Sequence, residues 1–228
     1  MSLLSNLQPQ RSAIKASNPM TQAVRHDQNT WAPVLAGSGG STILASLRSL
    51  PGASGTSFTV TRQDLCGLVR AGAPLVSRFA LTMIWGYAAG TTLGPSRVAG
   101  ILGAPGLQPR LAAAATDIGA GRWKNAYGNL RKIGGGLGVS YLTKFLYFEA
   151  RSQSQLQPGY PLIFDNRVSH ALVKFALDAN DSWVADVTNT QRGEGWRRYS
   201  NYLSQMHALA GQLHVDADEL EYWLFLNA

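Results

Sequence analysis

Four glycines fall within five positions, Gly134, Gly135, Gly136 and Gly138, directly before an apolar stretch that is typical of a helix. Glycine at 136 and 138 permits positive φ angles and lets another backbone approach closely. The unpaired amides at the start of the following helix attract an anion, and a DNA phosphate is one such anion. The alternative is a plain tight turn between two helices.

A single carboxylate stands at the start of a second helix, in the run PLIFDNRVSHAL. Asp165 follows a proline-containing loop, and aspartate is a favoured N-cap residue. A capped carboxylate that is held rigidly at a helix start can also face a cleft. Asp165 is therefore a candidate for both roles.

A lysine lies within the helix that follows the glycines. Lys144 comes four residues after Ser140, so the two side chains share one face of the helix about 6 Å apart along its axis. The alternative is a lysine that extends from a half-buried helix to place its amine in water.

Short helices must position these residues, and glycine or proline bounds most of them. One helix starts at Thr61, and after a break at residues 72–74 a second runs to about Trp85. Further helices are predicted at about 95–102, 108–119, 121–132, 139–150, 165–177, 199–213 and 216–226. The fold class is therefore all-α, with a helix–hairpin–helix at about 121–150.

Two segments differ in amino-acid composition from the predicted helices. Residues 1–60 are rich in Ser, Gly, Asn, Pro and Gln and predict an irregular N-terminal arm, with weak helical patches around 21–30 and 42–48. Residues 181–198 are polar enough to predict a loop excursion. We therefore expect an arm at 1–60 and a helical domain at 61–228.

The composition narrows the class of partner. A net charge of +7 favours a polyanion such as nucleic acid. The lone Cys66 excludes a disulfide framework and a cysteine-based metal site, and the four scattered histidines predict no metal site either. We expect a cytoplasmic protein without a membrane span, because no segment reaches about 20 apolar residues.

Two motifs, GGGLGVSYLTKFLYF and PLIFDNRVSHAL, resemble the helix–hairpin–helix DNA glycosylases of base excision. TKFLYF and IWGYAAG are similar to stretches of the compact prokaryotic subgroup that resembles 8-oxoguanine glycosylases. The resemblance covers about residues 61–226, with specific motifs in 132–172. It implies two helical lobes around a cleft, a prokaryotic source and a monomer that acts on double-stranded DNA with a modified base.

The resemblance also implies roles for the candidate residues. Asp165 would be catalytic, by stabilising the positive charge that develops on the sugar or by activating water. Ser140 occupies the position where bifunctional members carry their nucleophilic lysine, which implies base removal without efficient strand cleavage. Lys144 would line the base pocket and read the base, or act as a displaced nucleophile.

The remaining expectations concern DNA. The DNA backbone would be bound by the hairpin and neighbouring residues, namely Gly134, Gly136, Gly138, Ser140, Lys132 and Arg167. Trp85 and Tyr87 are candidate walls of a pocket for a flipped base, with core packing as the alternative. No cofactor is expected, apart from a monovalent cation that the hairpin could hold.

The identity of the excised base has two alternatives. The resemblance implies an oxidised purine, removed in repair, or glucosylated hydroxymethylcytosine, removed from viral DNA in antiphage defence. The departures from the repair pattern, which are Lys144, the N-terminal arm and the 181–198 excursion, favour a bulky base and the defence role. A non-catalytic helix–hairpin–helix DNA-binding module is the main alternative. A third hypothesis, an RNA-binding or assembly protein, is supported only by the net charge.

Overall fold

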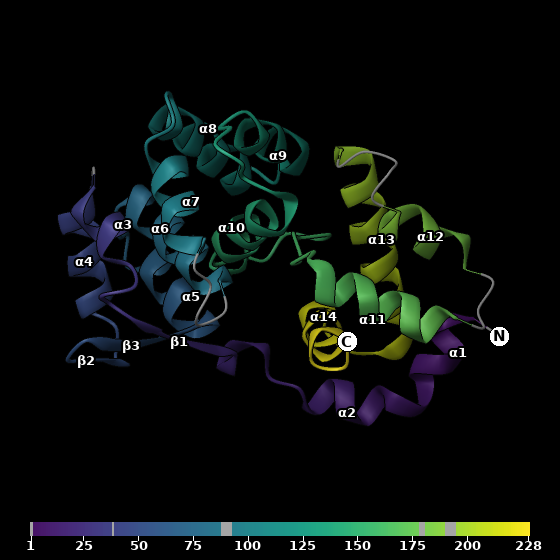
Figure 1. Cartoon of the computed structure of the whole chain (residues 1–228). Helices are drawn as coiled ribbons and strands as arrows, with labels where there is room; N and C mark the ends of the chain where they lie inside the picture. Colours follow the sequence, from purple (N-terminus) through teal and green to yellow (C-terminus); the bar gives the residue numbers. More distant parts are fainter. Residues whose placement is uncertain (1, 38, 88–92, 178–180, 190–194) are drawn as a thin grey trace. The chain divides into compact units, whose positions relative to one another are not determined.

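The computed structural model describes residues 2–37, 39–87, 93–177, 181–189 and 195–228 (Figure 1). The chain divides into two compact units, Met1–Pro19 with Pro158–Ala228 as unit 1, and Met20–Gln157 as unit 2. This division differs from the expected boundary at residue 60. The reason is that Leu3, Leu7 and Ile14 are fully buried, in helices that pack on the C-terminal helices.

Helices dominate unit 2, which confirms the all-α class. The helices are α3 (Ala32–Ala36), α4 (Gly40–Arg48), α5 (Arg62–Arg70), α6 (Leu75–Gly86), α7 (Gly94–Leu102), α8 (Leu107–Gly119), α9 (Trp123–Arg131) and α10 (Val139–Arg151). Thr61 and Asp64 form a capping box that begins α5. Helix α10 lies at the centre of the unit and packs against α5, α6, α8 and α9.

A small antiparallel sheet accompanies these helices, in the strand order β1-β3-β2. Its strands are β1 (Ala23–Asp27), β2 (Ala53–Ser54) and β3 (Ser57–Thr61). The helical patch predicted around 21–30 is therefore wrong, because β1 pairs along its whole length with β3. The patch predicted around 42–48 is confirmed by α4, so the described part of residues 1–60 is not irregular.

Unit 1 is also helical. It contains α1 (Leu3–Leu7), α2 (Arg11–Ala16), α11 (Asn166–Ala176), α12 (Ser182–Thr188), α13 (Trp196–Leu213) and α14 (Ala217–Leu226). A short 3-10 helix occupies Gln8–Gln10, and another, Pro19–Thr21, begins at the residue where unit 1 passes into unit 2. The predicted loop excursion at 181–198 contains α12, because Val184 and Val187 lie three residues apart and bury the same helix face. Residues 190–194 of that excursion lie outside the described residues.

Across the described ranges, no helix is both long enough and apolar enough to cross a membrane.

Candidate functional site

The glycine turn joins α9 to α10 and explains three of its four glycines by backbone conformation. Gly134, Gly135 and Gly136 have φ angles of +77°, +64° and +81°, in the left-handed region that favours glycine. The expectation of a positive φ at Gly138 is wrong. Gly138 is extended, with φ −77° and ψ 163°, and it is the N-cap residue of α10.

The three positive-φ glycines differ in what surrounds them. A Cβ on Gly135 would lie 3.1 Å from the Cα of Ile101 in α7, so this glycine permits the close packing of the turn on that helix. A Cβ on Gly134, Gly136 or Gly138 would meet no described atom within 4 Å. Space is therefore open over the candidate backbone-binding glycines, while Gly135 has a packing role that the sequence did not reveal.

The first turn of α10 begins without a side-chain cap. The Gly138 carbonyl accepts hydrogen bonds from the amides of Tyr141 and Leu142, and no side chain caps the helix N-terminus. Lys132, the C-cap residue of α9, is exposed just before the turn. The positive end of the helix dipole and a nearby lysine together suit an anion.

Lys144 is buried in the second turn of α10, with only 5% of its surface exposed. Its Nζ donates a hydrogen bond to Ser140 Oγ over 2.9 Å, and it lies 5.8 Å from the centre of the Tyr141 ring. The predicted pairing of Ser140 with Lys144 on one helix face therefore matches a direct contact. The amine is held by protein groups, unlike that of a lysine that extends into water.

An aromatic pair lies beside this lysine. Tyr87, the C-cap residue of α6, stacks on Tyr141 with ring centres 4.6 Å apart. Gly86 makes room for the arrangement, because a Cβ there would lie 2.8 Å from Tyr141 Cε1 and 3.2 Å from Lys144 Cδ. We call Gly86, Tyr87, Ser140, Tyr141 and Lys144 the lysine cluster.

Two members of the lysine cluster were missed by sequence reasoning. Tyr141 could have been found, since it lies three residues before Lys144 and so on the same helix face. Gly86 gave no comparable signal, because its role depends on a contact between α6 and α10. Residues 88–90 of the IWGYAAG stretch lie outside the described residues.

Trp85 has different surroundings from Tyr87. The residue is 3% exposed. Its ring meets that of Phe148 edge to face with ring centres 5.2 Å apart, and its centre lies 5.6 Å from the guanidinium carbon of buried Arg62. These are core contacts of unit 2. The role of Trp85 as a pocket wall stays a prediction, and the structure brings only Tyr87 of the two aromatics into stacking contact with Tyr141.

We expect Gly86→Ala to disturb the lysine cluster. The new methyl group would displace the Tyr141 ring and the Lys144 stem, so the free energy of unfolding should fall by about 1–3 kcal/mol. Urea unfolding measures this loss. Gly67→Ala in α5 is the matched control, because its Cβ meets no described atom within 4 Å and should stabilise the helix by roughly 0.5–1 kcal/mol. Equal effects of the two substitutions would contradict the steric argument.

Asp165 caps a helix of unit 1. Its Oδ1 accepts hydrogen bonds from the amides of Arg167 at 3.1 Å and Val168 at 3.2 Å, at the start of α11. The N-cap role is therefore confirmed. The carboxylate is half-buried and fixed by backbone amides, and the exposed Arg167 places its guanidinium carbon 4.5 Å from the Phe225 ring centre.

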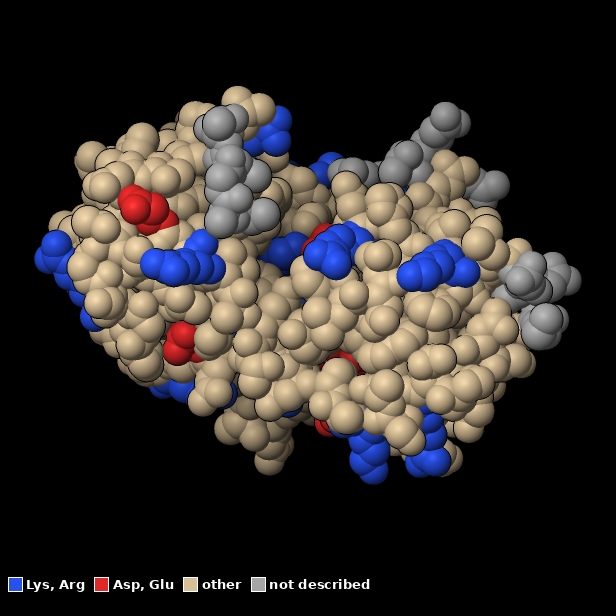
Figure 2. Space-filling model, turned by 60° about the horizontal axis from the view of Figure 1, so that its bottom comes forward, with Lys and Arg blue, Asp and Glu red and all other residues tan. Residues whose placement is uncertain are grey.

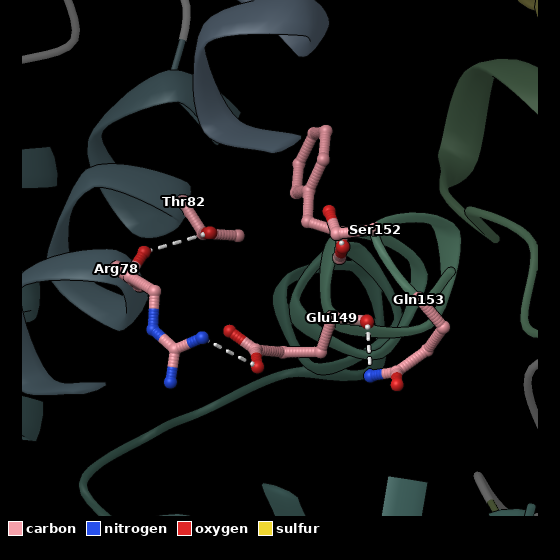
Figure 3. Close-up of polar contacts among 6 residues, drawn as sticks. Arg78, Thr82, Glu149, Ser152 and Gln153 are labelled. Carbon is pink, nitrogen blue, oxygen red and sulfur yellow. Dashed lines mark hydrogen bonds and ion pairs between the residues drawn. The ribbon is translucent and has the colours of Figure 1, made fainter. Parts of the chain in front are cut away.

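An ion pair between the half-buried Arg78 and the buried Glu149 links α6 to the helix that carries the lysine cluster. Arg78 Nη1 lies 3.1 Å from Glu149 Oε2, and both side chains point into the space between α6 and α10 (Figure 3). Burial raises the pKa of Glu149 to about 7, and the neighbouring Arg78 only partly opposes this rise. Glu149 Oε1 is buried without a hydrogen-bond partner among the described residues.

Glu149 makes the stability of the folded chain depend on pH. Its pKa is about 7 in the folded chain and 4.5 ordinarily, so its stabilising contribution is complete below pH 4.5 and is lost as pH rises through 7. The loss is on the order of 3 kcal/mol. In urea unfolding, we expect the free energy of unfolding of wild type to fall relative to that of Glu149→Gln as pH rises from about 5 to about 8.

The comparison with Glu149→Gln is needed because His26 acts in the opposite sense. Burial lowers the pKa of His26 from 6.5 to about 4. Its contribution to the stability of the folded chain is therefore complete above pH 6.5 and is lost as pH falls through about 4. Both proteins retain His26, and the difference between them isolates Glu149. If the difference in free energy of unfolding between wild type and Glu149→Gln stayed constant with pH, Glu149 would not be the source of the pH dependence.

On the face drawn in Figure 2, lysine and arginine side chains are spread among uncharged residues and acidic side chains are few. Within the described part of the chain, no group of three or more His, Cys, Asp or Glu could hold a metal ion. The expected absence of a metal stays a prediction.

A family model described as "Putative 8-oxoguanine DNA glycosylase OGG-like protein" matches residues 17–225. The match includes the glycine turn, the lysine cluster and Asp165. No curated protein and no solved structure gives a significant match.

Proposed function

Because this chain belongs to the family of OGG-like 8-oxoguanine DNA glycosylases, we propose that it excises a modified base from double-stranded DNA and leaves an abasic site. The observation that carries the proposal is the buried Lys144, which Ser140 anchors in a helix that starts at an open glycine turn. A helix–hairpin–helix module that only held DNA would have no use for a buried amine beside a tyrosine stack.

The glycine turn would bind the DNA backbone. The open space over Gly134, Gly136 and Gly138 allows a phosphate to approach main-chain amides, and the uncapped N-terminus of α10 favours its charge. Lys132 would add a direct phosphate contact, as would Arg167 from unit 1. These contacts would hold the strand without reading its sequence.

Asp165 would serve the chemical step. As the bond between C1′ and the base breaks, its electron pair leaves with the base and positive charge develops on the sugar. A carboxylate stabilises that charge and accepts the proton of the water that adds to C1′. The two amide hydrogen bonds that fix Asp165 keep it in one orientation, which is what such a role requires.

Lys144 would read the base. Its ammonium group can donate hydrogen bonds to oxygen atoms of a modified base, while the Tyr87–Tyr141 stack offers an aromatic surface next to it. Water is then the nucleophile, which makes the enzyme monofunctional. We make this assignment because Ser140 stands at the position where bifunctional members of the family carry their nucleophilic lysine.

Two substrates fit the proposal. Glucosylated hydroxymethylcytosine, excised from viral DNA in defence, is favoured by a buried lysine that can donate hydrogen bonds to sugar hydroxyls. 8-Oxoguanine, excised in repair, is favoured by the description of the matching family. Both carry an added oxygen acceptor that an amine can recognise.

A panel of modified DNAs tests the proposal. The full-length protein is incubated with phage DNA that carries glucosylated hydroxymethylcytosine, with an 8-oxoguanine duplex and with matched unmodified DNA, and released base is measured by mass spectrometry. We expect free base and alkali-labile abasic sites from one modified substrate only. DNA binding without base release from any member would favour the non-catalytic module.

A further inference from the structure

A buried segment without regular secondary structure leads to the carboxylate that the proposed reaction uses. Residues 160–164 directly precede Asp165, and all five of them are buried. The backbone carbonyls of such a segment need hydrogen-bond partners, because a buried polar group that is left unpaired is costly. The segment belongs to no helix or strand, so side chains of other elements can supply these partners.

Two tyrosines of α13 bind successive carbonyls of this segment. Tyr199 Oη donates a hydrogen bond to the carbonyl oxygen of Leu162 over 2.7 Å. Tyr202 Oη donates one to the carbonyl oxygen of Ile163 over 2.8 Å. Both tyrosines are buried, and they lie three residues apart on one face of the helix. A single helix therefore fixes two neighbouring peptide units of the segment.

Two further contacts join α13 to the ends of the same segment. His207 Nε2 lies 2.9 Å from the carbonyl oxygen of Tyr160 and donates a hydrogen bond to it, because a carbonyl oxygen only accepts. The ring of Phe164, the residue directly before Asp165, packs against the ring of Tyr202 with ring centres 4.5 Å apart. The helix thus holds the segment from its first residue to its last.

The backbone carries this restraint on to Asp165. This residue is extended, with φ −127° and ψ 178°, and a single planar peptide unit joins it to Phe164. The amides of Arg167 and Val168 orient the carboxylate, whereas the segment before it sets where the residue lies. A misplacement of about 1 Å can slow a catalysed step by about 10²-fold.

We propose that Tyr199 and Tyr202 are positioning residues for Asp165, whose carboxylate they hold in place through the backbone of residues 160–164. Their hydroxyl groups act on the protein backbone and not on the DNA. The inference rests on the catalytic role proposed for Asp165. All of these residues belong to unit 1.

Tyr202→Phe tests the inference, because it removes the hydroxyl group and keeps the ring that packs against Phe164. Single-turnover base release and DNA affinity are measured for Tyr202→Phe, for Asp165→Asn and for the double variant, on the substrate found in the DNA panel. We expect Tyr202→Phe to slow base release about tenfold without changing DNA affinity. In the Asp165→Asn background it should slow the residual reaction no further, because a residue that acts through a carboxylate has no effect once the carboxylate is absent.

The single variants separate this inference from the proposed function. If Asp165→Asn releases base at the wild-type rate, the catalytic role of Asp165 is wrong and its positioning has no meaning. If Asp165→Asn is slow but Tyr202→Phe matches wild type, only the positioning role is wrong. The same conclusion holds if Tyr202→Phe slows both backgrounds equally, since a general loss of stability would do so.

Hydrogen exchange followed by NMR tests the positioning without any substrate. The amides of Arg167 and Val168 report on the carboxylate, because Asp165 accepts their hydrogen bonds. We expect Tyr202→Phe to speed their exchange by about three- to tenfold. Tyr127→Phe is the matched control, because it removes the hydroxyl group of a buried tyrosine in α9 of unit 2 and should leave both amides unchanged. Exchange at the wild-type rate in Tyr202→Phe would overturn the inference.

Discussion

Asp165→Asn should abolish most base release while it leaves the fold intact. The substitution removes the charge that would stabilise the sugar cation and accept a proton from water, so we expect the single-turnover rate to fall by about 10²–10⁴-fold. Asparagine caps a helix as well as aspartate does, and its carbonyl oxygen can accept from the same amides of Arg167 and Val168. DNA affinity and the melting temperature should therefore stay close to those of wild type.

Asp165→Ala is the matched control for this experiment. It removes the cap as well as the charge, so the free energy of unfolding should fall by about 1 kcal/mol, which Asp165→Asn should not show. The two variants thus separate the structural role of Asp165 from its chemical role. If Asp165→Asn released base at the wild-type rate, Asp165 would be only an N-cap and the catalytic carboxylate would lie elsewhere.

Lys144→Met should weaken recognition of the modified base. Methionine keeps the buried stem of Lys144 but has no amine, so the hydrogen bonds to the base and to Ser140 are lost. A hydrogen bond from a charged donor contributes about 1.5–3 kcal/mol, so kcat/KM for the modified base should fall by about 10- to 100-fold. Steady-state kinetics on the substrate found in the DNA panel measures this loss.

Borohydride distinguishes the two roles considered for Lys144. A lysine that attacks the sugar forms a Schiff base that borohydride traps as a covalent complex with DNA. We expect no trapped complex from wild type, because water is the proposed nucleophile. A complex that forms with wild type and disappears in Lys144→Met would show instead that Lys144 is the nucleophile, and Ser140→Ala would then test whether the anchoring hydroxyl positions it.

The sequence by itself determined where most helices begin and end. Asp165 at the start of α11, the Thr61–Asp64 capping box at α5 and the glycines between α9 and α10 are local signals, read over a few residues. The pairing of Ser140 with Lys144 was predictable for the same reason, since the helix repeat fixes which side chains share a face. The candidate site was therefore visible wherever it depends on neighbours in the chain.

Only the tertiary structure decided the features that depend on contacts between distant segments. Gly135 is required by Ile101 and Gly86 by Tyr141, and neither contact follows from local sequence. The burial of Glu149 beside Arg78 arises in the same way, as does the packing of residues 1–19 with the C-terminal helices. Helix propensity and capping act over a single turn, whereas packing and desolvation depend on which surfaces meet after the chain has folded.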